Sequence, residues 1–298
     1  MQIATLIICL LAGYLVKSFK ALPSSPHISI NIWVLYVALP ATTLRYIPSL
    51  KLDSNLILPI ISPPLLFFLA WIFLLIVKKI FNWWNKETFG AVLLTIGLGN
   101  TSFMGFPLTK AYFGLEGFKI SVLFDQVNFI IMSTAGIFVA ILYGNKNKNI
   151  NTKALFIEII SFPSFIAFIL SISLFKVINI EFINPILDIL SATLIPLALF
   201  SIGLQLNLGN FFNEKKIIFF SLGFKLFISP LIILIVGYLL KIKGLEYSVS
   251  VFESSMAPMA TTSILAAQYG LNFELTNKAL SLGIIISLFT TYFWQFIV

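Results

Sequence analysis

Charged and reactive residues are scarce in this 298-residue chain, and their scarcity excludes whole classes of protein. Charged side chains make up 10% of the residues, far below the roughly 25% of a soluble domain. Cys9 is the single cysteine and His27 the single histidine, which excludes an internal disulfide and a His/Cys metal centre. An enzyme would need a nucleophile with a base, or a metal cluster, and dispersed carboxylates provide neither. We therefore expect no catalysis, no cofactor and no metal.

Apolar sequence, by contrast, is abundant. Hydrophobic residues make up 59% of the chain, with 31 phenylalanines and a mean hydropathy of +1.02. Runs long enough to cross ~30 Å of hydrocarbon follow one another with short loops between them. The net charge of +8 comes mainly from basic residues in those loops, so it is a topology signal rather than a nucleic-acid-binding patch. The composition predicts an all-α, multi-pass protein of the inner cell membrane, with the lipid bilayer as a partner.

Ten apolar runs are expected to be transmembrane helices. Their approximate bounds are 2–19, 28–47, 55–80, 88–113, 118–143, 153–175, 182–205, 214–240, 245–270 and 273–297. The first, third, fifth, seventh and ninth loops hold eleven Lys and Arg residues, whereas the other four hold seven. Because basic residues favour cytoplasmic loops, both termini are expected on the non-cytoplasmic side.

The stretch from Gly97 to Pro107, GLGNTSFMGFP, interrupts the fourth run with residues that a spanning helix avoids. Its glycines lower helix propensity, and Pro107 removes a backbone donor and clashes with the preceding turn. In hydrocarbon, broken backbone is tolerated only where protein or a water-filled cavity satisfies its N–H and C=O groups. The stretch therefore predicts a broken helix at a ligand site, not a lipid-facing surface.

The two halves of the chain share features at one constant offset of 156 residues. Pro40 then matches Pro196, Gly114 matches Gly270, and the first break falls on Glu253–Ser263, ESSMAPMATTS. Five runs in each half predict two repeats of opposite orientation, at 1–148 and 149–298. Paired Gly/Pro-interrupted helices in inverted halves are typical of secondary transporters with a site at the bilayer midplane. The alternative is a chance match, because transmembrane helices often contain Gly and Pro.

A family resemblance follows from these two stretches. GNTSFMGFPL, beginning at Gly99, and MAPMATTSILAAQYG, beginning at Met256, resemble the signature segments of the auxin efflux carrier family, which includes bacterial organic-acid carriers. The resemblance extends over all ten runs, and Asn100, Gly105 and Pro107 stand where the family has them.

The resemblance implies that the broken fourth and ninth helices cross at mid-membrane. A transport domain of spans 3–5 and 8–10 would move against a scaffold of spans 1, 2, 6 and 7, with Asn100 contacting the carboxylate of an anionic substrate. The chain departs from the family at Gly99, where plant members have proline. It also departs at Ala257 and Thr261, where many bacterial members have Pro and Asn. Because of these departures, the identity of the substrate is not carried over.

The residues of the two breaks suit a small organic anion. Broken helices present N–H groups and the positive ends of their dipoles, which can hold a carboxylate without a buried lysine. Amide and hydroxyl side chains add donors, although membrane-embedded threonines also commonly bond their own backbone. The candidate substrate-binding residues are Gly99, Asn100, Thr101, Pro107, Pro258, Thr261 and Thr262. Pro40 and Pro196 are expected to kink scaffold helices instead of contacting ligand.

Three ionisable residues lie within apolar runs: Asp125, Lys225 and Glu253. A charge at mid-membrane costs roughly 3 kcal/mol or more, so it usually marks a pathway or a pair. We expect Lys225 to pair with Glu253 or Asp125, leaving one carboxylate to take up a proton coupled to transport. The alternative is a static ion pair that stabilises the helix bundle.

Three further alternatives stay open on the sequence. A sodium-coupled carrier of the bile-acid symporter type would need carboxylates and carbonyls beside the crossing, for which Asp125, Gln126, Asn128 and Glu253 are candidates. A membrane sensor on the same fold would bind the ligand without moving it. The oligomeric state is open between a monomer and a homodimer.

Overall fold

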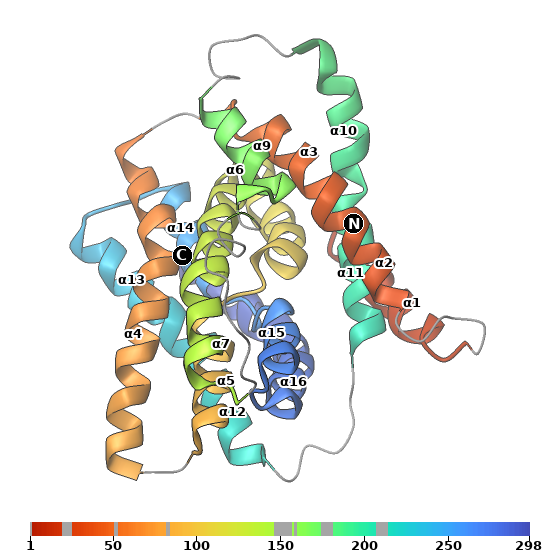
Figure 1. Ribbon diagram of the computed structural model, residues 1–298. Helices are drawn as coiled ribbons and strands as arrows, with labels where there is room; N and C mark the ends of the chain where they lie inside the picture. Colours follow the sequence, from red (N-terminus) through yellow and green to blue (C-terminus); the bar gives the residue numbers. More distant parts are fainter. Residues whose placement is uncertain are drawn as a thin grey trace. The chain divides into compact units, whose positions relative to one another are not determined.

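The computed structural model describes residues 2–19, 26–50, 53–81, 84–145, 157, 160–173, 181–206 and 214–298. These residues form helices joined by loops, with one isolated backbone bridge (Figure 1). The expected repeat boundary at 148/149 lies outside the described residues, as do both ends of the expected sixth span at 153–175. The chain divides into two compact units: the first is Met1–Asp53, Ser102–Gln126 and Ile150–Leu206, and the second is Ser54–Thr101, Val127–Asn149 and Asn207–Val298.

The first unit is a bundle of helices from three separate parts of the chain. Its elements are α1 (Gln2–Val16), α2 (Pro26–Trp33), the π-helical η1 (Val34–Ala38), α3 (Leu39–Tyr46), the first part of α6 (Phe106–Ile131), α9 (Pro163–Ile172), η5 (Glu181–Ile183), α10 (Asn184–Ala192) and α11 (Leu194–Gln205). Helix α3 packs against α9 and α10, and α1 packs along α11.

Two glycines bring α1 and α11 into backbone contact. A Cβ at Gly13 would overlap the carbonyl of Phe200, and a Cβ at Gly203 would overlap the carbonyl of Leu10. Small residues at such positions let membrane helices gain close van der Waals packing, because lipid supplies no hydrophobic force between helices. The α1–α11 contact therefore depends on these two missing side chains.

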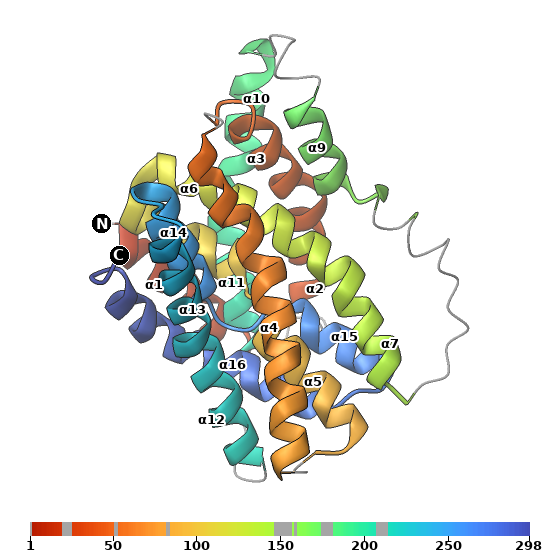
Figure 2. The same ribbon diagram turned by 90° about the vertical axis from the view of Figure 1, so that its left-hand side faces the viewer.

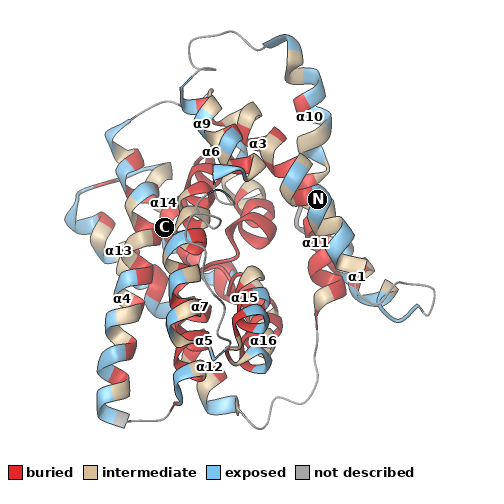
Figure 3. Cartoon of the chain, viewed as in Figure 1, coloured by how far each residue is buried: buried red, intermediate tan, exposed pale blue. Residues whose placement is uncertain are grey.

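The second unit contains both predicted breaks. Its elements are η2 (Ser54–Leu56), α4 (Ile57–Phe81), α5 (Lys86–Gly97), the end of α6 from Val127, η4 (Met132–Gly136), α7 (Ile137–Tyr143), α12 (Lys215–Gly223), η7 (Phe224–Ile228), α13 (Ser229–Leu239), α14 (Leu245–Ser254), α15 (Thr261–Tyr269) and α16 (Phe273–Trp294). Helix α5 is buried at every residue from Thr88 to Gly97 (Figure 3). It packs against α4, α7 and α16, while α4 also contacts α13 and α14 (Figure 2).

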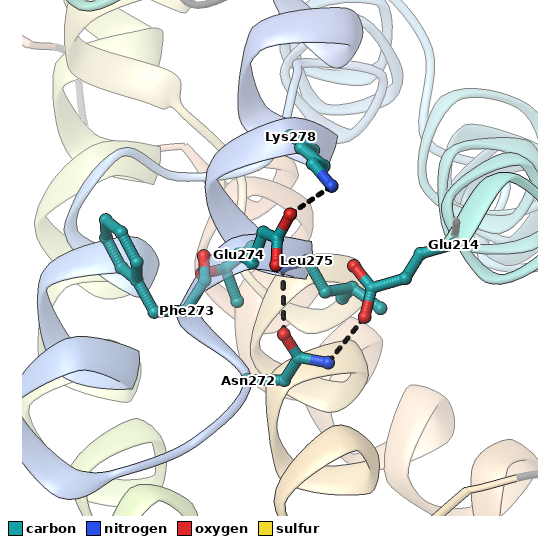
Figure 4. Close-up of polar contacts among 7 residues, drawn as sticks. Glu214, Asn272, Phe273, Glu274, Leu275 and Lys278 are labelled. Carbon is teal, nitrogen blue, oxygen red and sulfur yellow. Dashed lines mark hydrogen bonds and ion pairs between the residues drawn. The ribbon is translucent and has the colours of Figure 1, made fainter. Parts of the chain in front are cut away.

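The side-chain amide of Asn272 ties together the beginnings of three helices of this unit. Its Oδ1 accepts from the Leu275 N–H at 3.0 Å and so caps α16, and its Nδ2 donates to Glu214 Oε1 at 2.7 Å, next to the first residue of α12 (Figure 4). The same Nδ2 lies 3.3 Å from Thr88 Oγ1 in the first turn of α5. A carboxylate beside helix N-termini is favourable, because their dipoles are positive there.

Proline positions explain several irregular turns. The π-helical segments η1, η3 (Thr101–Gly105) and η7 each end two residues before a proline, namely Pro40, Pro107 and Pro230. A proline cannot donate to the i−4 carbonyl and its ring clashes there, so widening the preceding turn relieves the clash. A turn at Thr193 likewise separates α10 from α11 three residues before Pro196. Pro40 and Pro196 thus lie just after helix irregularities, as expected.

The described helices include six stretches that are long and apolar enough to cross a membrane: Pro26–Tyr46, Ser54–Ile80, Thr101–Tyr143, Glu181–Gln205, Lys215–Leu239 and Phe273–Trp294. Ala4–Val16 and Pro163–Ile172 are shorter apolar helices. The expected runs 88–113 and 118–143 are separated in the structure, because Gly114 has non-helical backbone (φ 68°, ψ −161°) and the stretch Thr101–Tyr143 consists of two helices that meet at this kink. The chain is an all-helical, multi-pass membrane protein in its described part, and ten separate spans stay a prediction.

Candidate functional site

The first break is shorter than the sequence predicted. Helix α5 ends at Gly97, Leu98 has extended backbone with φ −119° and ψ 129°, and helical structure resumes at Thr101. The expectation of a break as far as Pro107 is wrong, because residues 101–105 form the wide turns of η3 and Pro107 is the second residue of α6. The non-helical residues are Leu98, Gly99 and Asn100.

The second break separates α14, which ends at Ser254, from α15, which begins at Thr261. It includes Met256–Met259, all of which are buried, as is most of α14 before it. Glu253 belongs to the last turn of α14 and not to the break itself. With 12 and 10 residues, α5 and α14 are about 18 and 15 Å long at ~1.5 Å per residue, roughly half the thickness of the hydrocarbon.

The two breaks are joined to each other by their backbones. Gly99 and Pro258 form an antiparallel bridge, flanked by bonds from the Asn100 N–H to the Ala257 carbonyl (2.8 Å) and from the Met259 N–H to the Leu98 carbonyl (3.1 Å). Gly99 and Pro258 are therefore opposite each other as a non-hydrogen-bonded pair, in which the chains approach most closely. The missing N–H of Pro258 costs nothing at this position, because a residue of such a pair donates no bond to the opposite chain.

This pairing engages some of the donors that the sequence analysis assigned to a ligand. The sequence predicted that backbone N–H groups of the breaks would hold the ligand, but those of Asn100 and Met259 bond the opposite break. The N–H of Thr262 bonds the Met259 carbonyl, and the Thr262 hydroxyl donates to the same oxygen at 2.6 Å. Three N–H groups of the breaks are therefore engaged by the protein itself, and side-chain donors are further candidates for a ligand.

Asn100 provides such a donor. The residue is 2% exposed, and its Nδ2 has no hydrogen-bond partner among the described residues. An amide left unbonded in a protein interior costs about 1–3 kcal/mol, so native structures keep one only with a reason. Asn100 is thus held in the break by its backbone while its side-chain donor stays available.

Asn128, which the sequence analysis proposed only as part of a sodium site, supports the break from the end of α6. Its Nδ2 donates to the Gly99 carbonyl at 2.8 Å and to Thr101 Oγ1 at 3.2 Å. The Gly99 carbonyl points away from the opposite break in a non-hydrogen-bonded pair, so this amide satisfies it instead. Asn128 therefore uses its side-chain Nδ2 to position the break, whereas the Nδ2 of Asn100 stays available.

Lys225 lies at the same break, which the sequence analysis did not foresee. The residue is 2% exposed, and its Nζ lies 3.1 Å from the point that a Cβ on Gly99 would occupy. The η7 turn that carries it is fastened by Trp294, whose indole N–H donates to the Leu226 carbonyl at 2.8 Å. The carboxylate of Glu253, itself fully buried, attracts the ammonium electrostatically. The sequence signal that could have indicated this position is a lysine within an apolar run, five residues before Pro230.

The structure thus brings eight of the ten candidate residues into one unit: Gly99, Asn100, Thr101, Lys225, Glu253, Pro258, Thr261 and Thr262. Thr261 begins α15 in that unit and is partly exposed. Pro107 and Asp125 belong to the first unit, where Asp125 is 2% exposed. Next to Asp125, the Gln126 amide donates to Ser164 Oγ at 3.1 Å. Across the described residues, no group of three His, Cys, Asp or Glu side chains is arranged to hold a metal ion.

Comparison with known proteins agrees with this architecture. Residues 1–295 match a family described as membrane transport proteins. An uncharacterized transporter of Methanocaldococcus jannaschii is 31% identical, over 98% of this chain and 96% of the relative. An uncharacterized transporter of Methanothermobacter thermautotrophicus is 25% identical, also over 98% of this chain and 96% of the relative. The chain therefore belongs to the membrane transport protein family, the auxin efflux carrier family that its two broken stretches resemble.

Proposed function

We propose that this transporter is a secondary active carrier that moves a small organic anion across the cell membrane by alternating access. The observation that carries the proposal is the buried Asn100 amide, whose Nδ2 has no partner among the described residues and lies in a helix break. A carboxylate is the natural acceptor for a buried amide donor next to a lysine, because hydrogen bonds to charged groups are stronger than neutral ones. An abundance of aromatic residues, 15% of the chain, suits an apolar body on the anion.

Several features support an arrangement as two inverted repeats, at 1–148 and 149–298, with an elevator-like movement. Gly114 and Gly270, which correspond at the constant offset, both have positive φ, at 68° and 75°. Pro40 and Pro196 both follow irregular turns, and each half contains one broken helix. Paired broken helices in inverted halves are the arrangement from which alternating access is built in other carriers. We propose that both termini face the non-cytoplasmic side, from the distribution of basic residues in the loops.

The coupling ion is proposed to be a proton, taken up by Glu253 or Asp125. Both carboxylates are buried, at 0% and 2% exposure, and a buried ionisable residue within a membrane segment commonly marks an ion or proton pathway. If a proton on either residue drives accumulation, Glu253→Gln or Asp125→Asn abolishes accumulation driven by a pH gradient but leaves anion exchange intact. Uptake by liposomes that depends on a sodium gradient instead would establish the sodium-coupled alternative. Binding without any flux would establish a sensor.

The proposal is tested by ligand binding to the purified protein. Sodium benzoate, succinate and citrate are compared with choline chloride and glucose for their effect on thermal unfolding in detergent, followed by titration of the Kd. Asn100→Ala should weaken binding of the stabilising carboxylate about ten- to a hundredfold, because it removes a donor to a charged group. Thr261→Ala is the control and should change the Kd less. Stabilisation by choline or glucose alone, or an unchanged Kd in folded Asn100→Ala, would exclude the proposed site.

A further inference from the structure

The Lys225 ammonium lies directly against the position that a Cβ at Gly99 would occupy. Its Nζ and Cε lie 3.1 and 3.5 Å from the ideal Cβ position of Gly99, and the residue is 2% exposed. An alanine at position 99 would put its methyl group closer to the ammonium than side chains ordinarily tolerate. The absence of a side chain at Gly99 is thus what admits the ammonium to the backbone of the break.

A buried ammonium needs a compensating negative charge, because its removal from water is costly. Glu253 provides one in the ligand-free protein: it is fully buried, precedes the second break and attracts Lys225. Ser229, one turn beyond Lys225, is also fully buried, and its hydroxyl has no partner among the residues the structure describes. A buried hydroxyl therefore lies one turn from Lys225 on the same helical stretch.

We infer that Lys225 is a substrate-contacting residue: it provides the positive charge for one carboxylate of the transported anion, and Glu253 balances that charge when the site is empty. The inference rests on the proposed anion transport and specifies the substrate class as a monocarboxylate. Asn100, whose amide is available, is the next residue after Gly99, so both groups belong to the same short break. One fixed positive charge offsets one carboxylate, whereas further carboxylates would enter a buried site uncompensated.

Opposite charge changes at this site should have opposite effects on anion binding. Lys225→Met leaves the Glu253 charge and should weaken benzoate binding about tenfold or more, as expected for loss of a bond to a charged group. Glu253→Gln leaves the ammonium without its balancing charge, so benzoate should bind more tightly and raise the Tm more than in the wild type. The matched control is Lys216→Met, on the same helical stretch but exposed, and it should leave the Kd unchanged.

The experiment measures Kd and Tm shift for sodium benzoate and disodium succinate with wild-type protein and these variants. Wild type should prefer benzoate, and Gly99→Ala should weaken benzoate binding, because its methyl group displaces the ammonium. If Lys225→Met does not fold, the neutral double variant Lys225→Met/Glu253→Gln replaces it and should still bind benzoate weakly. Lys225→Arg keeps the charge and should retain part of the affinity.

The outcomes separate this inference from the proposed function. If Asn100→Ala weakens benzoate binding while Lys225→Met and the double variant bind as the wild type does, Lys225 is only a structural ion-pair partner and the inference is wrong. A wild type that prefers succinate also overturns it. If Asn100→Ala has no effect, or no carboxylate binds at all, the proposed function fails and the inference fails with it.

Discussion

Asn100 and Asn128 present the same amide group to one helix break, yet the structure predicts opposite consequences of removing each. Asn128 donates to the Gly99 carbonyl at 2.8 Å and to Thr101 Oγ1 at 3.2 Å, and it is 3% exposed. Asn100 is 2% exposed, with no partner for its Nδ2 in the described part of the chain. Removal of the Asn128 amide should therefore mainly lower stability, whereas removal of the Asn100 amide should mainly weaken ligand binding.

Asn128→Ala should lower the free energy of unfolding by about 1–3 kcal/mol. The Gly99 carbonyl is opposite Pro258 in a non-hydrogen-bonded pair, so the change leaves it buried without the donor that the structure provides. Asn100→Ala breaks no side-chain bond through Nδ2 and should change stability by less than ~1 kcal/mol, since an unpaired buried amide is itself unfavourable. Ligand affinity should fall more in Asn100→Ala than in Asn128→Ala, because Asn100 holds the available donor.

The assay is unfolding by SDS titration in mixed micelles, followed by carboxylate titration of each folded variant. Thr134→Ala is a matched control on the same helical stretch, because its exposed hydroxyl bonds its own helix at the Ile130 carbonyl. Equal losses of stability for both asparagine variants would refute the reasoning. A wild-type free energy of unfolding for Asn128→Ala would likewise show that the Gly99 carbonyl does not depend on this amide.

Three further predictions concern packing, the η7 turn and topology. Gly13→Ala should lower the free energy of unfolding by about 1–3 kcal/mol, because its Cβ would overlap the Phe200 carbonyl and push α1 away from α11. An unchanged SDS unfolding curve would contradict this. Trp294→Phe should both destabilise the protein and weaken benzoate binding, since the Leu226 carbonyl in the turn that carries the buried lysine loses its donor. Wild-type values for both would show that the indole does not position this turn. A cysteine introduced at Lys216 in a cysteine-free background tests the proposal that both termini are non-cytoplasmic, which places this loop in the cytoplasm. The cysteine should resist an impermeant thiol reagent added outside intact cells and react after permeabilisation. Labelling in intact cells would reverse the proposed orientation.

The sequence by itself determined the class of the protein and the places where its helices break. Both are local properties: long apolar runs need a bilayer, and Gly, Pro and polar residues weaken a helix wherever they occur. The resemblance carried by Asn100, Gly105 and Pro107 led to the correct family. Local signals also explain the error at the first break, because the clash at Pro107 is relieved by the wide turns of η3 instead of a longer loop.

Only the tertiary structure decided which groups meet at the break. The pairing of Gly99 with Pro258, the bond from Asn128 to Gly99 and the place of Lys225 beside Gly99 all join residues far apart in the chain. No local pattern encodes such contacts, because each depends on how several helices pack. The same packing engaged the N–H groups of Asn100 and Met259, two of the backbone donors that the sequence had assigned to the ligand. It thereby left the Asn100 amide and the Lys225 ammonium as the groups on which anion binding is proposed to depend.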